Sequence, residues 1–190
     1  RPKKTGAAGD PFYVLPGVAL FDTVSDAVFS VNVVLYMPIR VVTSIVLNTV
    51  ALNVSLGQAA TTARMGIYNA DTDWQPTSLV LDAGTVALDT AGIKTIAITQ
   101  TLSAGRYLLA LNSNASTAKV RQIKGASPAI YNDQVGTPSF YMLTQMYATQ
   151  TYAAFPDPGL AWTTASSGRN ESQTTVSGFY YYFVLGVGTP

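Results

Sequence analysis

Short apolar runs alternate with turn residues along most of this chain, and no run has the length and period of an amphipathic helix. Turn-forming residues gather at 69–73, 82–84, 89–92 and 103–105, with Val, Ile, Leu, Thr and Tyr between them. Many short strands at such spacing are typical of a sandwich or a jelly roll. The sequence therefore predicts an all-β fold, a single antiparallel β-sandwich or jelly-roll domain.

The composition also favours strands. Charged residues make up 11% of the chain, less than half of the usual share of about 25%. Glu171 is the only glutamate. Helical surfaces usually carry Glu and Lys, whereas Thr, Val, Ile and Tyr favour strands, so this composition argues against helices.

Two absent residue types exclude several classes of site. The chain contains no Cys and no His. A disulfide framework, a thiolate nucleophile, a Ser-His-Asp triad and a histidine zinc site are therefore excluded. The net charge of +1 gives no case for nucleic acid, and no run has the roughly 20 apolar residues of a membrane span. We expect no cofactor, no metal, no nucleic acid partner and no membrane insertion.

The chain divides into an arm and one domain. Residues 1–11 predict a flexible N-terminal arm or linker, and residues 12–190 a single β-sandwich domain. Pro38 is expected to mark a bend or strand edge because proline has no backbone donor, and Asn48 to interrupt the following run. The expected strands are residues 12–15, 28–37, 39–47, 49–56, 63–68, 78–81, 85–88, 93–99, 106–111, 118–122, 140–152 and 178–186.

Two late segments deserve separate expectations. Residues 153–175 are rich in Pro, Gly and Ser and predict a long loop, which in a compact domain is usually functional or covered by a partner. Residues 178–186 form a closing strand that is apolar on both faces. Such a strand is either central in its sheet or packed against another subunit.

The order of short sequence motifs along the chain resembles that of a β-sandwich module found at the outer ends of bacteriophage fibre and spike proteins. A strand that ends at a proline is followed by a small-residue turn, an Ala-Arg-x-Gly-Ile-Tyr motif, and then a Leu-x-x-Gly-x-Tyr-x-Leu-Ala motif. A late Phe-Pro-Asp-Pro sequence and a closing apolar strand complete the pattern. The matching segments here are residues 34–39, 57–60, 63–68, 102–110, 155–158 and 178–186.

The resemblance implies a virion structural protein at the surface of a phage particle, in a tail or head fibre. It implies attachment to host cell-surface polysaccharide, with a capsid or tail decoration and assembly role as the alternative. A homo-oligomer, a trimer by this resemblance, and contacts with other virion proteins are expected. The family offers no catalytic residues to carry over, and we expect no enzyme.

Residues 69–74 carry the strongest candidates for surface chemistry. Asp71 and Asp73 offer oxygen atoms to a sugar or to Ca²⁺, and the ring of Trp74 can stack on the apolar face of a pyranose. The structural alternative is a solvated loop in which Asp caps the backbone and Trp74 folds onto the edge of the core.

A second group of candidate glycan contacts lies in or beside the long loop: Tyr152, Phe155 and Trp162. Tyr68 is included with them. Covering a neighbouring subunit is the alternative for this group, because aromatic residues are also enriched in protein interfaces.

Arg64 and the acids complete the search. A paired or stacked charge is favoured for Arg64, with a sugar or phosphate contact as the alternative. A glycosidase needs two carboxylates that flank one bond, and Asp73 with Asp157 is an example of such a pair. No spacing singles out any pair, so catalytic residues are not assigned.

Overall fold

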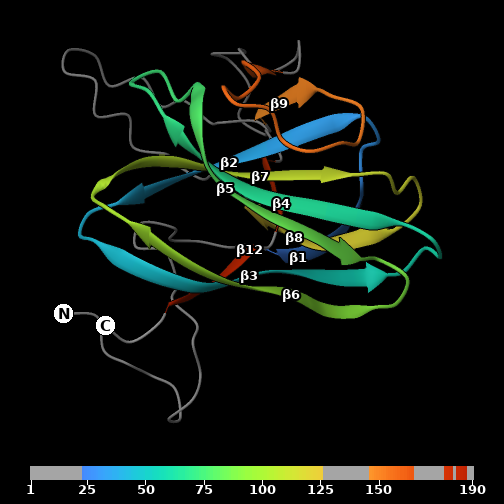
Figure 1. The fold of residues 1–190 in the computed structure, drawn as a ribbon. Helices are drawn as coiled ribbons and strands as arrows, with labels where there is room; N and C mark the ends of the chain where they lie inside the picture. The colour runs from blue at the N-terminus through green and yellow to red at the C-terminus, as the bar shows by residue number, and fades with distance from the viewer. Residues whose placement is uncertain (1–22, 126–145, 165–177, 182, 188–190) are drawn as a thin grey trace.

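The computed structural model describes residues 23–125, 146–164, 178–181 and 183–187. None of these residues is helical, and so none forms a helix long and apolar enough to cross a membrane. They form antiparallel strands arranged in two sheets that lie one above the other (Figure 1). The predicted all-β fold is confirmed.

The first eight strands make a jelly roll. In the lower sheet of Figure 1, sheet A, pairing gives the order β1-β8-β3-β6, and in the upper sheet, sheet B, it gives β2-β7-β4-β5. Chain order therefore moves repeatedly between the sheets, as in the double Greek key of a jelly roll. The strands are β1 (Thr23–Val28), β2 (Val33–Val41), β3 (Ile45–Leu56), β4 (Thr62–Ala70), β5 (Pro76–Ala87), β6 (Gly92–Leu102), β7 (Gly105–Ser113) and β8 (Lys119–Gly125).

Four later strands extend both sheets. The closing strand β12 pairs with β3 on the side opposite β6, and β11 pairs with β8. Within the described residues, the closing segment thus joins sheet A through one strand partner for each of its halves. At the other sheet, β9 pairs with β2 and β10 pairs with β9. Their bounds are β9 (Met146–Thr149), β10 (Thr163–Thr164), β11 (Gly178–Tyr181) and β12 (Phe183–Val187).

The main core lies between the sheets. Alternate residues of the sheet B strands point inward and meet alternate residues of sheet A. This core is continuous along the sandwich, with one cluster around Met65 and Leu111 and another around Ile67 and Leu109. Every second residue of the sheet B strands thus packs against apolar residues of sheet A, as a sandwich requires.

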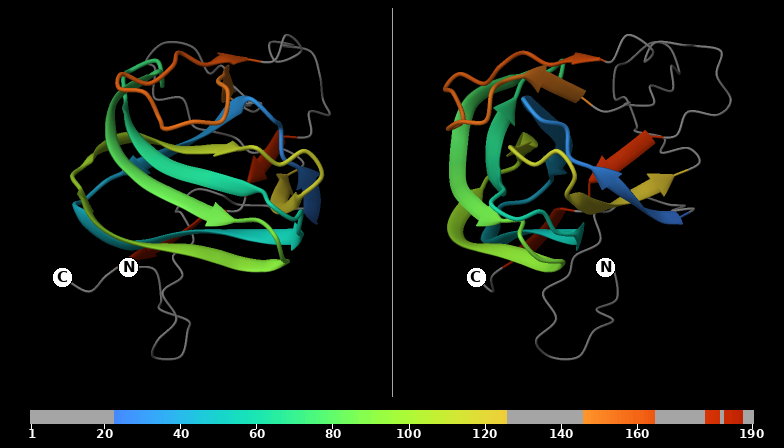
Figure 2. Two further views of the ribbon diagram at one scale, coloured as in Figure 1. Left: turned by 45° about the vertical axis from the view of Figure 1, so that its right-hand side comes forward. Right: turned by 90° about the vertical axis from the view of Figure 1, so that its right-hand side faces the viewer.

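Sheet B buries its outer face as well. Tyr36, Tyr68, Leu108 and Ala110 belong to a further core cluster on the side away from sheet A, although that side of a sandwich commonly faces water. Residues 150–162, which we call the strap, cover this face, and Phe155 of the strap is buried within the cluster. Figure 2 shows the strap, in orange, against sheet B and away from sheet A.

The strand boundaries expected at Pro38 and Asn48 are wrong, although Pro38 does lie at a strand edge, as one of its two expected positions requires. β2 continues through Pro38, which is a register partner of Leu108, because β9 pairs with β2 only as far as Tyr36. Beyond that point β2 has a strand neighbour on one side alone within the described residues, and such an edge tolerates the missing donor of proline. β3 likewise continues through Asn48, which lies at a shift in register with β6.

The expected turn at residues 82–84 is also wrong, since β5 is continuous there. Asp82 is the register partner of Gly66 and Gly84 is the partner of Met65, so Ala83 is an extra residue on the β5 side. Gly84 has a φ of 91°, a conformation that glycine adopts without steric cost. The turn residues therefore form a β-bulge within one strand. By contrast, the turns expected at residues 89–92 and 103–105 do separate strands.

Several expectations lie outside the described residues. These are the arm at 1–11, the strand at 12–15, the first part of the strand at 140–152, the later part of the loop at 153–175, and the side chains of 178–186.

The strap predicts an unusual pattern of stability across β7. Leu108 faces the strap and Leu109 faces sheet A, and they are 0% and 1% exposed. Leu108→Ala and Leu109→Ala are each expected to lower the free energy of unfolding by about 2–5 kcal/mol. Ile93→Ala, at a side chain 58% exposed, should change it by less than about 0.5 kcal/mol. Urea denaturation measures all three; a Leu108→Ala variant that behaves like Ile93→Ala would mean that the strap leaves the outer face uncovered.

Candidate functional site

The seven candidate residues lie in three places. Asp71, Asp73, Trp74 and Trp162 gather where β4 turns into β5, at one end of sheet B. Tyr68 and Phe155 are buried together between sheet B and the strap, and Tyr152 lies near the start of β4. The structure therefore brings together four of the seven at the surface.

The loop between β4 and β5 is held by Asp71. Its Oδ1 accepts hydrogen bonds from the backbone N–H groups of Asp73 (2.9 Å) and Gln75 (2.8 Å). Its backbone carbonyl accepts one from the N–H of Trp74 at 3.3 Å, and Trp74 itself has a φ of 61°. A short polar side chain that caps its own turn stabilises such a backbone. One carboxylate oxygen of Asp71 is thus committed to the turn, as expected if this segment is a loop in which Asp caps the backbone.

Trp74 is fixed from two directions. The guanidinium carbon of Arg106 lies 5.4 Å from the Trp74 ring centroid, and Arg106 Nη1 donates to the carbonyl of Thr72 at 2.7 Å. From the strap, Trp162 Nε1 donates to the carbonyl of Trp74. We call Asp71, Thr72, Asp73, Trp74, Arg106 and Trp162 the tip cluster.

The tip cluster exposes polar groups beside partly exposed rings. Asp71, Thr72 and Asp73 are exposed, while Trp74, Arg106 and Trp162 are half-buried. The Trp162 backbone N–H also donates to Gln75 Oε1 at 3.0 Å, which holds the strap to the loop. The result is a surface of two partly exposed indole rings, two carboxylates and a hydroxyl, carried by a backbone that hydrogen bonds hold in place.

Sequence reasoning missed Arg106 and Gln75. Arg106 follows a turn some 30 positions along the chain, and only the pairing of Tyr107 on β7 with Asn69 on β4 brings it to the loop. No local signal marks that neighbourhood. Gln75 directly follows the predicted loop, so its position was available, but its contact with the strap was not.

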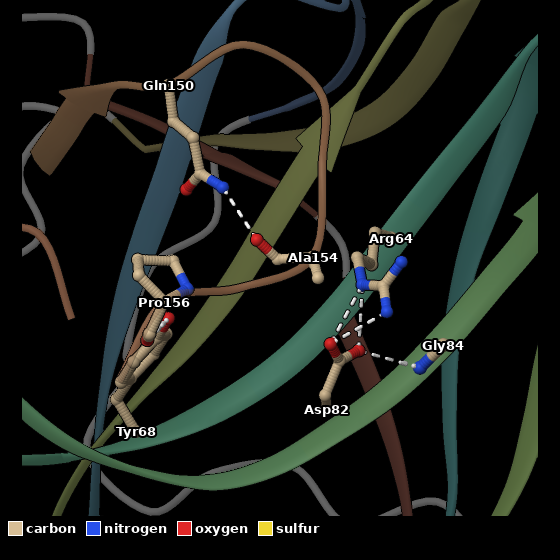
Figure 3. Close-up of polar contacts among 7 residues, drawn as sticks. All are labelled: Arg64, Tyr68, Asp82, Gly84, Gln150, Ala154 and Pro156. Carbon is tan, nitrogen blue, oxygen red and sulfur yellow. Dashed lines mark hydrogen bonds and ion pairs between the residues drawn. The ribbon is translucent and has the colours of Figure 1, made fainter. Parts of the chain in front are cut away.

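Tyr68 and Phe155 are core residues. They are 0% and 6% exposed, and their ring centroids lie 6.0 Å apart in an edge-to-face arrangement. The Tyr68 hydroxyl donates a hydrogen bond to the carbonyl of Pro156 at 2.7 Å (Tyr68 and Pro156 in Figure 3). Neither ring has a face open to a sugar, so their part is to hold the strap.

Glycine makes the space for Phe155. A Cβ atom on Gly66 would lie 2.7 Å from the Phe155 ring and 2.9 Å from the Leu81 carbonyl oxygen. Close packing therefore requires the Gly of the Ala-Arg-x-Gly-Ile-Tyr motif.

Tyr152 belongs to neither group. It is half-buried, and its hydroxyl accepts a hydrogen bond from Thr62 Oγ1 at 2.6 Å. Thr62 begins β4 whereas the tip cluster follows its end, so Tyr152 is separate from the candidate site.

Arg64 is paired, as its favoured interpretation expects. Its Nε donates to both carboxylate oxygens of Asp82 at 2.9 Å, and Nη2 lies 2.8 Å from Oδ2. Asp82 Oδ1 also accepts from the N–H of Gly84 at 3.1 Å (Figure 3). The ion pair therefore joins β4 to the bulge in β5.

Asp157, one of the two acids named as an example of a carboxylate pair, is committed to holding the strap. Asp157 Oδ1 accepts from the backbone N–H of Leu79 at 3.0 Å, which ties the strap to β5. Within the part of the chain that the structure describes, no three acidic side chains gather closely enough to hold a metal ion. Asp71, Asp157 and Asp82 fix a turn, the strap and the bulge, respectively.

Two comparisons bear on identity. The chain matches no protein-family model, and no curated protein shows a significant match to its sequence.

The buried phenols predict a loss of stability in alkali. Burial raises the pKa of Tyr36 from 10.0 to about 12. Burial also raises the pKa of Tyr68, with smaller contributions from Tyr36, Asp82 and Asp157. Because the folded state holds these protons more tightly than the unfolded chain, their contribution is complete below pH 10 and is lost as the pH rises towards 12.

Urea denaturation at pH 9, 10 and 11 tests this expectation. Tyr36→Phe removes one of the two phenols, so its free energy of unfolding should fall less with pH than that of the native chain. Identical pH slopes in the two proteins would contradict the buried position of the Tyr36 hydroxyl.

Proposed function

We propose that this domain belongs to the surface of a phage particle and attaches it to host cell-surface polysaccharide through the tip cluster. The observation that carries the proposal is the tip cluster itself, in which half-buried indole rings lie beside exposed carboxylates and a hydroxyl. The order of sequence motifs, which resembles that of phage fibre modules, supports a location on the virion. The jelly roll is compatible with it, because capsid and lectin domains both use that architecture.

The chemistry of the cluster suits a sugar. The partly exposed rings of Trp74 and Trp162 offer apolar surface to the C–H face of a pyranose ring. The carboxylates of Asp71 and Asp73 accept hydrogen bonds from sugar hydroxyls, and the Thr72 hydroxyl can both donate to them and accept from them. Such small sites bind weakly, and several copies on one particle raise the overall affinity through avidity.

The loop is also well ordered before a ligand arrives. Asp71 caps the turn, Arg106 holds Thr72 and Trp74, and Trp162 ties the strap to the loop. A surface that keeps its shape loses less conformational entropy when it binds.

Adsorption to candidate host cells and to their purified surface polysaccharide tests the proposal. The labelled domain is measured as isolated and as a forced trimer, each as the native chain, Asp73→Ala and Trp162→Ala. Binding should be saturable, and each variant should weaken it about tenfold or more, the equivalent of about 1.4 kcal/mol.

The matched control is Asp89→Ala, an exposed acid in the turn between β5 and β6, which should bind as the native chain does. Circular dichroism checks that each variant folds. Absence of saturable binding by the folded forced trimer, across the hosts tested, argues against attachment through this domain.

A specific observation favours the alternative, a capsid or tail decoration role. Val28 and Leu56 are 46% and 50% exposed, and both are register partners of Lys119. These two exposed apolar side chains, on the strands to either side of Lys119, are what favours a surface covered by another protein. A domain that binds isolated capsids or tails, but not host cells, would support this second function.

A further inference from the structure

The strap belongs to an insertion whose two ends meet. β8 ends at Gly125 and β11 begins at Gly178, and these two glycines are register partners. Residues 126–177, which we call the insertion, therefore leave sheet A and return to it at one point. Within the insertion, β9, the strap and β10 lie on sheet B.

Docking of the insertion on sheet B uses contacts of the kind that bind a separate peptide. β9 adds to β2 as an extra strand, with Val33 opposite Thr149 and Tyr36 opposite Met146. Phe155 fills the space left by Gly66. This combination of strand addition and a buried aromatic anchor is a common mode of peptide recognition.

The polar contacts add to the same picture. The hydroxyls of Tyr68 and Tyr36 donate to the strap carbonyls of Pro156 and Leu160, at 2.7 and 3.2 Å. The N–H of Gly159 donates to the Thr77 carbonyl at 2.8 Å. Each of these contacts forms equally well whether the strap belongs to the same chain or to a neighbouring one.

The connections are long enough for either arrangement. Residues 126–145 and 165–177 join the docked part to sheet A, and when extended they reach on the order of 60 Å and 40 Å. Sheets in a sandwich are only about 10 Å apart. Chain segments of this length can therefore reach sheet B of the same copy or of a neighbouring one.

We propose that in the assembled homo-oligomer residues 146–164 of one copy dock on sheet B of a neighbouring copy. Such an exchange keeps every contact described above and adds none that must be newly evolved, which is why exchange of an identical element is a low-cost route to an oligomer. It also makes the tip cluster composite, since Trp162 comes from one copy and Trp74 and Arg106 from the other. The exchange does not depend on whether the tip cluster binds a glycan.

Cysteine pairs distinguish the two arrangements because the native chain has no Cys. Val33 and Thr149 are register partners across β2 and β9, and opposite residues in antiparallel strands lie within disulfide range. Val33→Cys and Thr149→Cys are made as two single variants, unfolded, mixed, refolded at high concentration, and oxidised.

A disulfide dimer that contains one chain of each variant is the expected product on a non-reducing gel, with one chain carrying a mass label. The matched control is a mixture of Thr49→Cys and Ala97→Cys, which are register partners within sheet A and outside the insertion. That mixture should give no mixed dimer above the level of random collision.

The double variant V33C/T149C completes the test. Exchange predicts covalent oligomers from it, whereas a disulfide formed wholly within monomers, together with no mixed dimer from the single variants, would overturn the proposal. A native chain that stays monomeric by light scattering at every concentration would overturn it as well. Adsorption of the native domain is measured separately, so a failed exchange and a failed attachment function are distinguishable.

Discussion

The contact of Phe155 with the outer face of sheet B is the one on which the rest of this structure depends. β7 carries the continuous apolar run Tyr107-Leu108-Leu109-Ala110-Leu111, so it cannot leave either face in water without cost. Sheet A covers one face, and the strap covers the other through Phe155, which occupies the space above Gly66. The jelly roll is therefore a three-layer structure along part of its length, with the strap as the third layer.

The same packing positions the candidate site. Because the strap is anchored at Phe155 and Asp157, its end reaches the loop after β4, where Trp162 meets Trp74. The loop supplies the exposed polar groups and the strap supplies one of the two indole rings. The site is thus a junction of two segments that lie far apart in the sequence, and its geometry depends on a core contact that itself touches no ligand.

The sequence predicted the parts of this structure that depend on local chemistry. Turn residues at 89–92 and 103–105 end strands as expected, and alternation and composition were enough to predict a sandwich or jelly roll. Pro38, Asn48 and Asp82 do not end their strands as expected, because whether such a residue ends a strand depends on the strands that pair with it. Local sequence does not contain that information.

The candidate site shows the same division. Residues 71–74 are recognisable because turn acids beside a Trp form a local sequence pattern. Arg106 was missed because it reaches the loop only through the pairing of β7 with β4. Tyr68 and Phe155 were interpreted as surface rings because an aromatic side chain gives no local sign of burial, although the two-sided apolar run of β7 does indicate that something covers sheet B.

The tyrosine hydroxyls that hold the strap have a consequence for how its sequence can drift. Tyr36 and Tyr68 bind main-chain carbonyls, which every residue type offers, so they recognise the path of the strap and are indifferent to its side chains. Gly159 is constrained, because a Cβ atom there would lie 2.7 Å from Pro76 and 2.8 Å from the Tyr68 ring. Between such fixed points the side chains of the strap that face outward can change without loss of docking, so the surface it presents can be remodelled while the layer beneath it stays the same.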